Sequence, residues 1–322
     1  MRNLGVGVIG LGNMGGGIAR NFQRAKTPLA VWDIDPDALR PFERAKGVEV
    51  LPPREMAGKC AVIIAVVPGS PEVAACLNGR KGILANARKG LVLYDLTTSD
   101  PAATKRLARR AARKGVAYLD GGMSGGAAGA AAGTLTLMLG GDAAAFRRTK
   151  RFLGPIAERV FHLGESGAGH TLKLIHNMVC HSIFMATCEG GRLAERNGIR
   201  LADMIEVFNV SNARSYASEI RFPRHILSGR WDAKSRVYNL EKDLRMAVAL
   251  GRRSGAEVKH GEATHAFLEK AAARGMLDLD YSLLYRDFEK IRRVRPKGRK
   301  VAAKRPAKRP AKRPGRRSRS GG

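Results

Sequence analysis

The chain has 322 residues, 44% of them hydrophobic, and carries a formal net charge of +30. This length and composition allow a substantial buried core, in one large domain or two ordinary ones. The four cysteines form no C-x-x-C pair and have no metal-like spacing with histidine, which argues against a disulfide framework and against a zinc site.

Membrane and secreted proteins are also disfavoured. The longest apolar run, residues 60–68, is far too short to cross a bilayer. The N-terminus leads directly into an apolar, strand-like stretch, without the basic segment, apolar region and cleavage site of a secretory leader. We therefore expect a cytoplasmic protein in a reducing compartment, with no membrane contact.

The first predicted strand, residues 4–9, leads into the pattern G-x-G-x-x-G and then into a helical pattern. A strand before these glycines and a helix after them is the context that a dinucleotide-binding loop requires. Gly10 permits the tight turn, Gly12 lets the backbone approach a pyrophosphate, and Gly15 allows helix and strand to pack closely. The pyrophosphate would lie at the helix N-terminus, where free N–H groups favour negative charge. The predicted cofactor ligands in this loop are Gly10, Leu11, Gly12, Asn13, Met14 and Gly15.

A carboxylate follows at the end of the second predicted strand, residues 29–35. Asp33 lies where an acidic residue binds the adenosine ribose hydroxyls. Asp33 and Asp35 would both repel a ribose phosphate, and no arginine follows Asp33 to receive one. The sequence therefore predicts NAD in preference to NADP. The alternative is that Asp33 is only a turn residue in the stretch DIDPD.

Strands and helices continue to alternate along the first half of the chain. The further strands are predicted at 60–67, 90–96, 116–120, 134–141 and 158–164, and the helices between them begin at Pro71, Pro101 and Asp142. This alternation predicts an α/β fold of Rossmann type, a doubly wound and mostly parallel sheet covered on both faces. Ligands of such sheets bind beyond the carboxyl ends of the strands. Four residues at such ends are predicted to face the cofactor: Val67, Pro68, Ser70 and Thr98.

Glycines cluster around a single serine in the stretch DGGMSGGAAGA, residues 120–130. A Ser-Gly-Gly turn exposes backbone N–H groups and a hydroxyl, which suits a carboxylate. Ser124, Gly125 and Gly126 are therefore candidate substrate ligands. A flexible surface loop is the alternative, but an alanine-rich run and a strand follow without a break.

Strand signals stop near residue 164, and helical patterns follow to residue 293. The first of them places Lys173, His176 and Asn177 on one face of a long helix. An unpaired buried ammonium is costly, and the usual consequence is a lowered pKa. We expect a dinucleotide-binding domain at residues 1–163 and an all-helical domain at residues 164–292, with the substrate in the cleft between them.

Together these motifs resemble those of the β-hydroxyacid dehydrogenase family, over about residues 4–290. GLGNMG matches the family's G-x-G-x-M-G, and DGGMSGGAAGA matches its carboxylate motif, with Gly122 and Met123 in place of Pro-Val. GAGHTLKLIHN matches the family's catalytic motif G-x-G-x-x-x-K-x-x-x-N. LEKDLRMAVALG carries its K-D-L, as Lys242 and Asp243.

This resemblance implies a nicotinamide-dependent oxidoreductase of small β-hydroxy acids or the matching semialdehydes. It makes Lys173 the catalytic acid/base and Asn177 the residue that orients the substrate. It also places Lys242 beside the nicotinamide and the substrate carboxylate on the Ser-Gly-Gly turn. His176 either shapes the substrate pocket or packs against it. Family members form homodimers or homotetramers through the helical domain, which we expect here.

Two other functions are considered. The pattern K-x-x-H-N also resembles the 6-phosphogluconate dehydrogenases, which decarboxylate a sugar phosphate oxidatively. Those enzymes have a glutamate seven residues after the lysine, where this chain has Cys180. The other alternative is a non-catalytic scaffold that binds nucleic acid or another polyanion. A scaffold, however, has no need to keep Lys173, Asn177 and the Ser-Gly-Gly turn together.

The basic charge is concentrated at the C-terminal end. Residues 292–322 contain 15 lysines and arginines and no acid, and AKRP occurs three times between residues 303 and 314. A segment with so little to bury predicts a disordered, extended tail at residues 293–322. The tail is either a solubilising appendage or an arm for nonspecific binding of nucleic acid and other polyanions. It has no aromatic side chain on which bases could stack.

Overall fold

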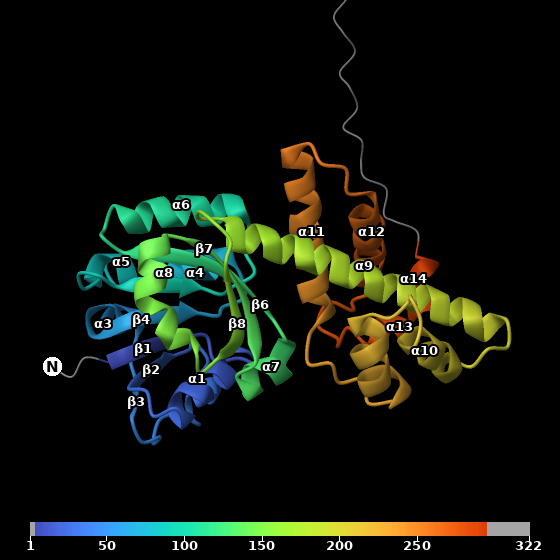
Figure 1. Cartoon of the computed structure of the whole chain (residues 1–322), viewed down its shortest axis with the longest axis horizontal. Coiled ribbons are helices and arrows are strands. Elements are labelled where there is room, and N and C mark those ends of the chain that lie inside the picture. Colours follow the sequence, from blue (N-terminus) through green and yellow to red (C-terminus); the bar gives the residue numbers. More distant parts are fainter. Residues whose placement is uncertain (1–3, 295–322) are drawn as a thin grey trace, which may run out of the picture.

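The computed structural model of the chain describes residues 4–294, so most of the predicted tail lies outside the described residues. An N-terminal domain is built on a single sheet, and a helical domain follows it. The long helix α9 (Ala168–Arg196) runs from the sheet domain across the helical domain (Figure 1). The Rossmann-type α/β fold and the all-helical second domain are thus confirmed. The expected boundaries at 163/164 and 292/293 stay predictions.

The sheet has eight strands in the order β3-β2-β1-β4-β5-β6-β7-β8. Their bounds are β1 (Leu4–Ile9), β2 (Leu29–Trp32), β3 (Val48–Val50), β4 (Cys60–Ala65), β5 (Val92–Asp95), β6 (Ala117–Ser124), β7 (Leu135–Gly141) and β8 (Ala157–His162). Neighbouring strands are parallel except β6 and β7, which pair antiparallel. The strand order reverses between β1 and β4, and in such sheets the ligand crevice lies beyond the carboxyl ends of the strands at this switch point.

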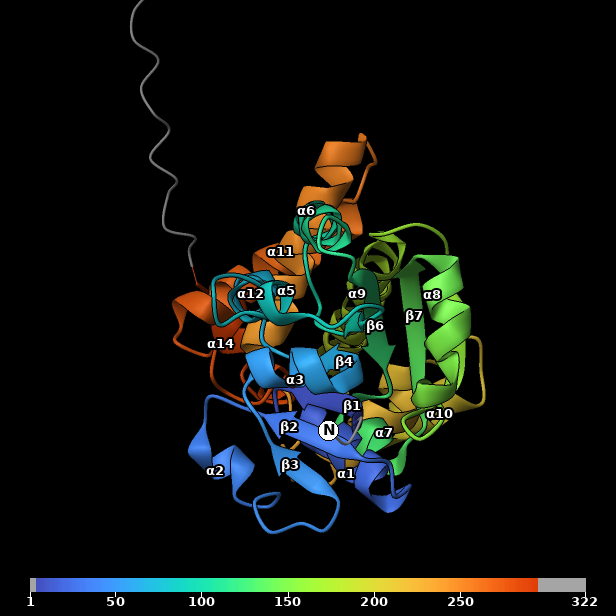
Figure 2. The ribbon, with the colours of Figure 1, turned by 90° about the vertical axis from the view of Figure 1, so that its left-hand side faces the viewer.

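Helices cover both faces of the sheet, and each face has its own core. One core contains residues of α1 (Gly15–Arg24), α7 (Gly126–Ala132) and α8 (Ala143–Thr149). The other contains residues of α3 (Pro53–Lys59), α4 (Ser70–Leu77), α5 (Ile83–Asn86) and α6 (Pro101–Ala112). Figure 2 shows α8 on one side of the sheet and α5 and α6 on the other. Successive strand residues such as Val62 and Ile63 enter opposite cores, as the alternation of a strand requires.

The helical domain has a separate core, which includes the side chains of Phe184, Phe222, Tyr281 and Tyr285. Its elements after α9 are α10 (Leu201–Asn209), the π-helix η2 (Ala217–Leu227), α11 (Val237–Ser254), α12 (Lys259–Ala273), α13 (Leu283–Arg286) and α14 (Phe288–Arg292). Among the described residues, no helix combines the length and apolar character needed to cross a membrane.

Three elements could not be recognised from the sequence pattern, and two of them are short. Strand β3 has three half-buried residues at the sheet edge, too few to show an alternation. The helix α2 (Pro36–Leu39) has a single turn. Within η2, Pro223 has the character of a helix breaker, but buried Phe222 and Ile226 hold the coiled segment in the domain core.

The start of α9 packs very closely on the sheet. A Cβ atom at Gly169 would lie 2.4 Å from the carbonyl oxygen of Asp120 and 2.7 Å from that of Met138. Both oxygens belong to backbone of β6 and β7, which cannot move aside cheaply. Only glycine therefore permits this approach of the helix to the strands.

Replacing Gly169 by alanine is expected to lower the free energy of unfolding by about 1–3 kcal/mol, because the added methyl group overpacks this contact. Gly190→Ala is the matched control on the same helix, since a Cβ there meets nothing within 4 Å. The control should gain about 0.5–1 kcal/mol from the better helix former. Urea unfolding of both variants measures the difference, and equal midpoints would contradict the close contact.

Candidate active site

A buried carboxylate of the sheet holds the first turn of α9. The Asp120 side chain, at 0% exposure, accepts hydrogen bonds from the backbone N–H groups of Gly167 (2.6 Å) and His170 (2.9 Å). The His170 ring is buried as well, with Nδ1 2.7 Å from Thr104 Oγ1 and Nε2 3.1 Å from the Asp95 carbonyl oxygen. Two of the orphan amides of the helix N-terminus are thereby satisfied inside the protein. These hydrogen bonds fix the direction in which α9 leaves the sheet.

Lys173 lies on that next turn and is buried, with 7% of its surface exposed. Its aliphatic stem passes Gly122 of β6, where a Cβ would lie 2.3 Å from the Lys173 Cβ. Burial lowers the pKa of the Lys173 ammonium from 10.5 to about 8, while the carboxylate of Asp243 opposes this shift. Arg221 and Lys242 add to the lowering. A lysine with such a pKa can exchange a proton near neutral pH.

Three polar side chains near Lys173 meet where α9 faces α11. Asn177 belongs to α9, and Lys242 and Asp243 belong to α11. Asn177 Nδ2 donates a hydrogen bond of 2.6 Å to Asp243 Oδ2, and Lys242 Nζ lies 3.6 Å from Asp243 Oδ1. Burial raises the pKa of the Asp243 carboxyl, and the cations of Lys242 and Lys173 oppose that rise. The Asp243 carboxylate therefore accepts a hydrogen bond from Asn177, forms an ion pair with Lys242 and favours the charged form of Lys173.

Lys242 also connects the helical domain to the sheet. Its ammonium donates hydrogen bonds to the carbonyl oxygens of Pro68 (2.9 Å) and Thr98 (3.3 Å). These two oxygens lie in the loops that follow β4 and β5, where Ser70 Oγ accepts a bond of 3.4 Å from the backbone N–H of Asp100. The structure thus brings Lys242 to the two loops that were predicted to face the cofactor.

His176 links the predicted catalytic residue Asn177 to Ser124, a predicted substrate ligand. Its Nδ1 lies 3.0 Å from Asn177 Oδ1, and its Nε2 lies 3.4 Å from Ser124 Oγ. Burial and the nearby Lys173 lower the pKa of His176, which favours the neutral ring. Because the Asn177 oxygen can only accept, Nδ1 donates to it and Nε2 is left to accept from the Ser124 hydroxyl.

Ser124 ends β6, and the chain then turns through Gly125 (φ +123°) and Gly126 (φ +62°) into α7. Nothing lies within 4 Å of where a Cβ of Gly126 would be, so the backbone is open on that side. This turn and the Lys173 face of α9 are joined by the contact between Ser124 and His176. The carboxylate-binding role of the turn stays a prediction.

The glycine-rich loop has the geometry that a dinucleotide needs. Gly10 has φ +88°, and a Cβ there would lie 2.2 Å from the Val66 carbonyl oxygen, whereas a Cβ at Gly12 would meet nothing within 4 Å. The Asp33 carboxylate accepts a hydrogen bond from the backbone N–H of Leu11, which holds it beside the loop. Open space over Gly12 at the start of α1 fits a pyrophosphate.

The other predicted loop residues have different surroundings. Asn13 Nδ2 donates a bond of 3.3 Å to the carbonyl oxygen of Lys234 in the helical domain. The side chains of Leu11 and Met14 pack in or against the sheet core, so these residues offer a cofactor mainly their backbone. The backbone N–H of Val67 donates a bond of 3.2 Å to Thr97 Oγ1, a neighbour of the predicted Thr98.

Comparison with known proteins decides the family. Residues 5–164 match the family model of the NAD-binding domain of 6-phosphogluconate dehydrogenase. Residues 167–288 match the model described as NAD-binding of NADP-dependent 3-hydroxyisobutyrate dehydrogenase. The chain is 30% identical to human mitochondrial 3-hydroxyisobutyrate dehydrogenase over 289 residues, 87% of this chain and 85% of that protein. The chain belongs to the β-hydroxyacid dehydrogenase family.

Further relatives agree with this membership. The L-threonate dehydrogenase of Cupriavidus necator is 33% identical over 271 residues, 84% of this chain and 91% of that protein. The structure of Mycobacterium tuberculosis 3-hydroxyisobutyrate dehydrogenase with L-serine superposes with a TM-score of 0.79 at 27% identity, covering 89% of this chain and 99% of that one. This β-hydroxyacid dehydrogenase is therefore an enzyme, a nicotinamide-dependent oxidoreductase of hydroxy acids.

Two residues of this site region carried no recognisable sequence signal. Asp120 is the first residue of the Ser-Gly-Gly stretch, but its bonds to α9 could not be foreseen. Arg221 lies within η2, and its Nη2 donates a hydrogen bond of 3.3 Å to Cys180 Sγ on α9.

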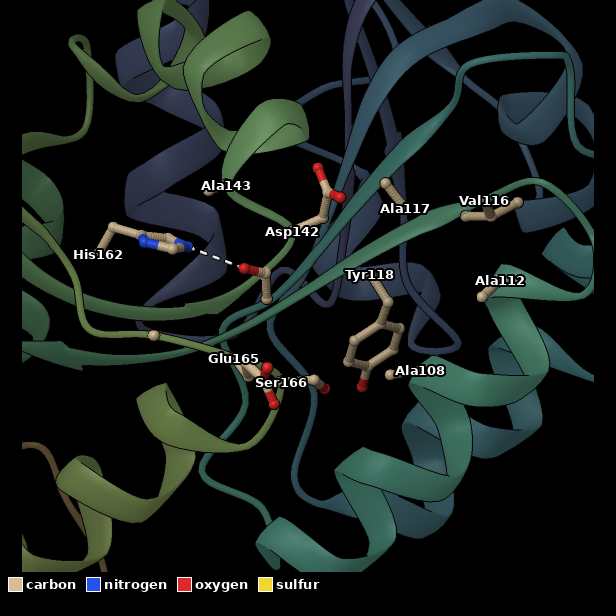
Figure 3. Close-up of a pocket in the computed structure, with 12 residues that line it drawn as sticks. Ala108, Ala112, Val116, Ala117, Tyr118, Asp142, Ala143, His162, Glu165 and Ser166 are labelled. Carbon is tan, nitrogen blue, oxygen red and sulfur yellow. Dashed lines mark hydrogen bonds between the residues drawn. The ribbon is translucent and has the colours of Figure 1, made fainter.

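A separate cavity of about 590 Å³ lies beside α6 and the strands β6 and β7 (Figure 3). Alanines of α6, Tyr118 and His162 line it, and His162 Nε2 lies 2.9 Å from the carbonyl oxygen of Gly141. None of the predicted site residues lines this cavity, so it is distinct from the Lys173 site.

The lowered pKa of Lys173 makes a prediction for stability. A protonated Lys173 is disfavoured in the folded state, so Lys173→Met should raise the free energy of unfolding by roughly 3 kcal/mol at pH 7. The gain is full below pH 8 and fades as the pH rises from 8 to 10.5, because the folded lysine then loses its proton before the unfolded one.

Urea unfolding of wild type and Lys173→Met at pH 7 and pH 10 measures this difference. Lys89→Met, at an exposed loop position, is the matched control and should show no such change with pH. A variant less stable than wild type at pH 7 would contradict the burial cost.

Proposed function

We propose that the enzyme oxidises a small β-hydroxy acid, or reduces the matching semialdehyde, with Lys173 as the general acid/base. The observation that carries this is the environment of Lys173, a buried lysine with its pKa lowered to about 8. Asn177 and Ser124 are connected to it through His176, and Lys242 reaches the loops of the cofactor side.

When bound, the nicotinamide accepts the hydride from the carbon that bears the hydroxyl. Neutral Lys173 takes the hydroxyl proton in the same direction and returns it in the reverse reaction. Asp243 holds the Asn177 amide in place, so this amide can orient the substrate. The amides of Gly125 and Gly126 and the hydroxyl of Ser124 bind the substrate carboxylate, and for this the Ser124 hydroxyl turns its proton from His176 Nε2 to the carboxylate. The close approach of β6 at Gly122 covers the aliphatic stem of Lys173 and keeps this side chain buried.

NAD is the proposed cofactor. Asp33 lies beside the glycine-rich loop and would accept hydrogen bonds from the ribose hydroxyls, whereas its charge would repel a ribose phosphate. The nearby Arg40 is paired with Asp37 at 2.9 Å. The cofactor ligands are then the loop from Gly10 to Gly15, with Asp33, Val67, Pro68, Ser70, Thr98 and Lys242.

A homodimer or homotetramer is the proposed assembly. Leu172, Ile175, Val179 and Ile183 form an exposed apolar stripe on α9, on the helix surface away from Lys173. Exposed apolar stripes of this kind mark protein–protein contacts. A cytoplasmic location is proposed as well, since all four cysteines are free thiols.

Oxidative decarboxylation of a sugar phosphate is disfavoured. That reaction needs a second acid, and Cys180 occupies the position of the glutamate that supplies it. The Cys180 sulfur accepts a hydrogen bond from Arg221 and is a poor proton donor for this step.

Turnover should depend on Lys173. Across a panel of β-hydroxy acids and semialdehydes, NADH absorbance should report turnover, and Lys173→Ala should lower kcat/KM at least about 100-fold. For oxidation, kcat/KM should rise with pH and level off above about 8, where the lysine is neutral. Lys89→Ala is the control. A variant that retains activity, or a profile independent of pH between 6 and 9, would exclude Lys173 as the base.

The preference between NAD and NADP should depend on Asp33. Asp33→Ser should lower kcat/KM for NAD about tenfold and raise it for NADP, because it removes both the ribose acceptor and the repulsion of a phosphate. Glu43→Gln, which removes an exposed carboxylate further along the chain, is the control and should leave the ratio unchanged. Wild-type preference for NADP would refute the proposed role of Asp33.

A further inference from the structure

Arg221 is a half-buried cation among aromatic rings. Its guanidinium carbon lies 5.4 Å from the ring centroid of Phe184, 5.7 Å from that of Tyr216 and 5.1 Å from that of Tyr281. Rings at these distances attract the charge of a guanidinium, but they accept few of its in-plane hydrogen bonds. The residue is therefore held firmly in position while much of its hydrogen-bonding capacity is left over.

The remaining contacts of Arg221 are weak. Its Nη2 donates to Cys180 Sγ at 3.3 Å, and a thiol is a weak acceptor. Its Nε and Nη1 are buried and have no hydrogen-bond acceptor among residues 4–294. Within the same range, no carboxylate lies within ion-pair distance of it. A buried guanidinium without an anion is unfavourable, so the surroundings of Arg221 favour binding of one.

The position of Arg221 relates it to the Lys173 site. Its contact Cys180 is seven residues after Lys173, so it lies on the same face of α9 about 10 Å further along the helix. Asp243, the buried carboxylate that raises the pKa of Lys173, is already shared by Asn177 and Lys242. Beside Cys180, this face of α9 therefore meets a positive charge, that of Arg221, which has no carboxylate partner among residues 4–294.

We propose that Arg221 binds a second carboxylate of the substrate, so that the enzyme prefers β-hydroxy acids with two acidic groups. This rests on the proposed function, in which Lys173 meets the hydroxyl and the Ser124 turn meets the first carboxylate. The second carboxylate enters beside Cys180 and replaces the thiol as the acceptor of the guanidinium. Arg221 is then a specificity-determining residue, and it takes no part in the proton transfer.

A carboxylate fits this place better than a phosphate. A planar carboxylate accepts two parallel hydrogen bonds from one guanidinium and carries a single charge. A phosphate dianion is held best by several donors at once, and the direct contacts of the Arg221 guanidinium are aromatic rings and a thiol. Substrates in which a short aliphatic chain separates the two acidic groups therefore match the site.

The test compares substrates of equal size. 2-(Hydroxymethyl)glutarate carries a second carboxylate, and its 5-amide has the same shape without the second charge. For the wild type, kcat/KM should be about 100-fold higher for the diacid than for the amide, as expected for a charged hydrogen bond in a buried site. A phosphorylated hydroxy acid, 6-phosphogluconate, is included as the alternative anion.

Three variants locate the effect. Arg221→Met should reduce the diacid-to-amide ratio to near one, and Arg221→Lys should keep part of it because the charge remains. Arg224→Met, at an exposed position of the same helix, is the matched control and should keep the full ratio. Calorimetric binding of diacid and amide to the NADH-loaded enzyme tests the same preference without turnover.

Several results would overturn the proposal. These are equal binding of diacid and amide by the wild type, an equal loss for both in Arg221→Met, and a preference for the phosphorylated acid over both. An equal loss accompanied by a lower unfolding temperature would assign Arg221 to packing. Tight, Arg221-dependent binding of the diacid without turnover would support the carboxylate site and reject the proposed function alone.

Discussion

The carboxylate of Asp120 determines where the chemistry of this protein can take place. It lies at the middle of β6 and binds two backbone amides at the start of α9, one turn before Lys173. Hydrogen bonds from amides to a buried carboxylate are stronger than neutral ones, about 1.5–3 kcal/mol each. Together with the close contact between Gly169 and the strands, these hydrogen bonds fix the direction of α9. The helical domain is thereby attached to the sheet at a fixed point.

From this attachment the electrostatics of the site follow. Lys173 is buried because its helix starts flush with the sheet, and burial lowers its pKa. Asp243 moderates the shift, but it also binds Lys242 and the amide of Asn177. A carboxylate given wholly to Lys173 would keep the ammonium protonated. Sharing it leaves the lysine charged or neutral according to the pH, which is what a general acid/base requires.

The departures from the family pattern also fit this packing. Where the family has Pro-Val, this chain has Gly122 and Met123. The aliphatic stem of Lys173 occupies the space that a side chain at Gly122 would need. Cys180, in the place of the glutamate of the 6-phosphogluconate enzymes, contacts Arg221 instead of supplying a proton. Both changes concern the walls of the site, whereas the Lys173 and Asn177 pair is kept.

The sequence by itself determined the elements with strong local signals: the apolar strands, the glycine-rich turn, and a helix face bearing Lys173 and Asn177. Their periodicity and spacing arise from contacts within a few residues, so the Rossmann-type sheet and the family could be predicted. Only the tertiary structure decided what meets that face. Asp120 binds Gly167 at the start of α9 across 47 residues of sequence, and Lys242 binds Pro68 across 174 residues. Arg221 contacts Cys180 across 41 residues. Such pairs leave no pattern along the chain, because they depend on how separate elements pack.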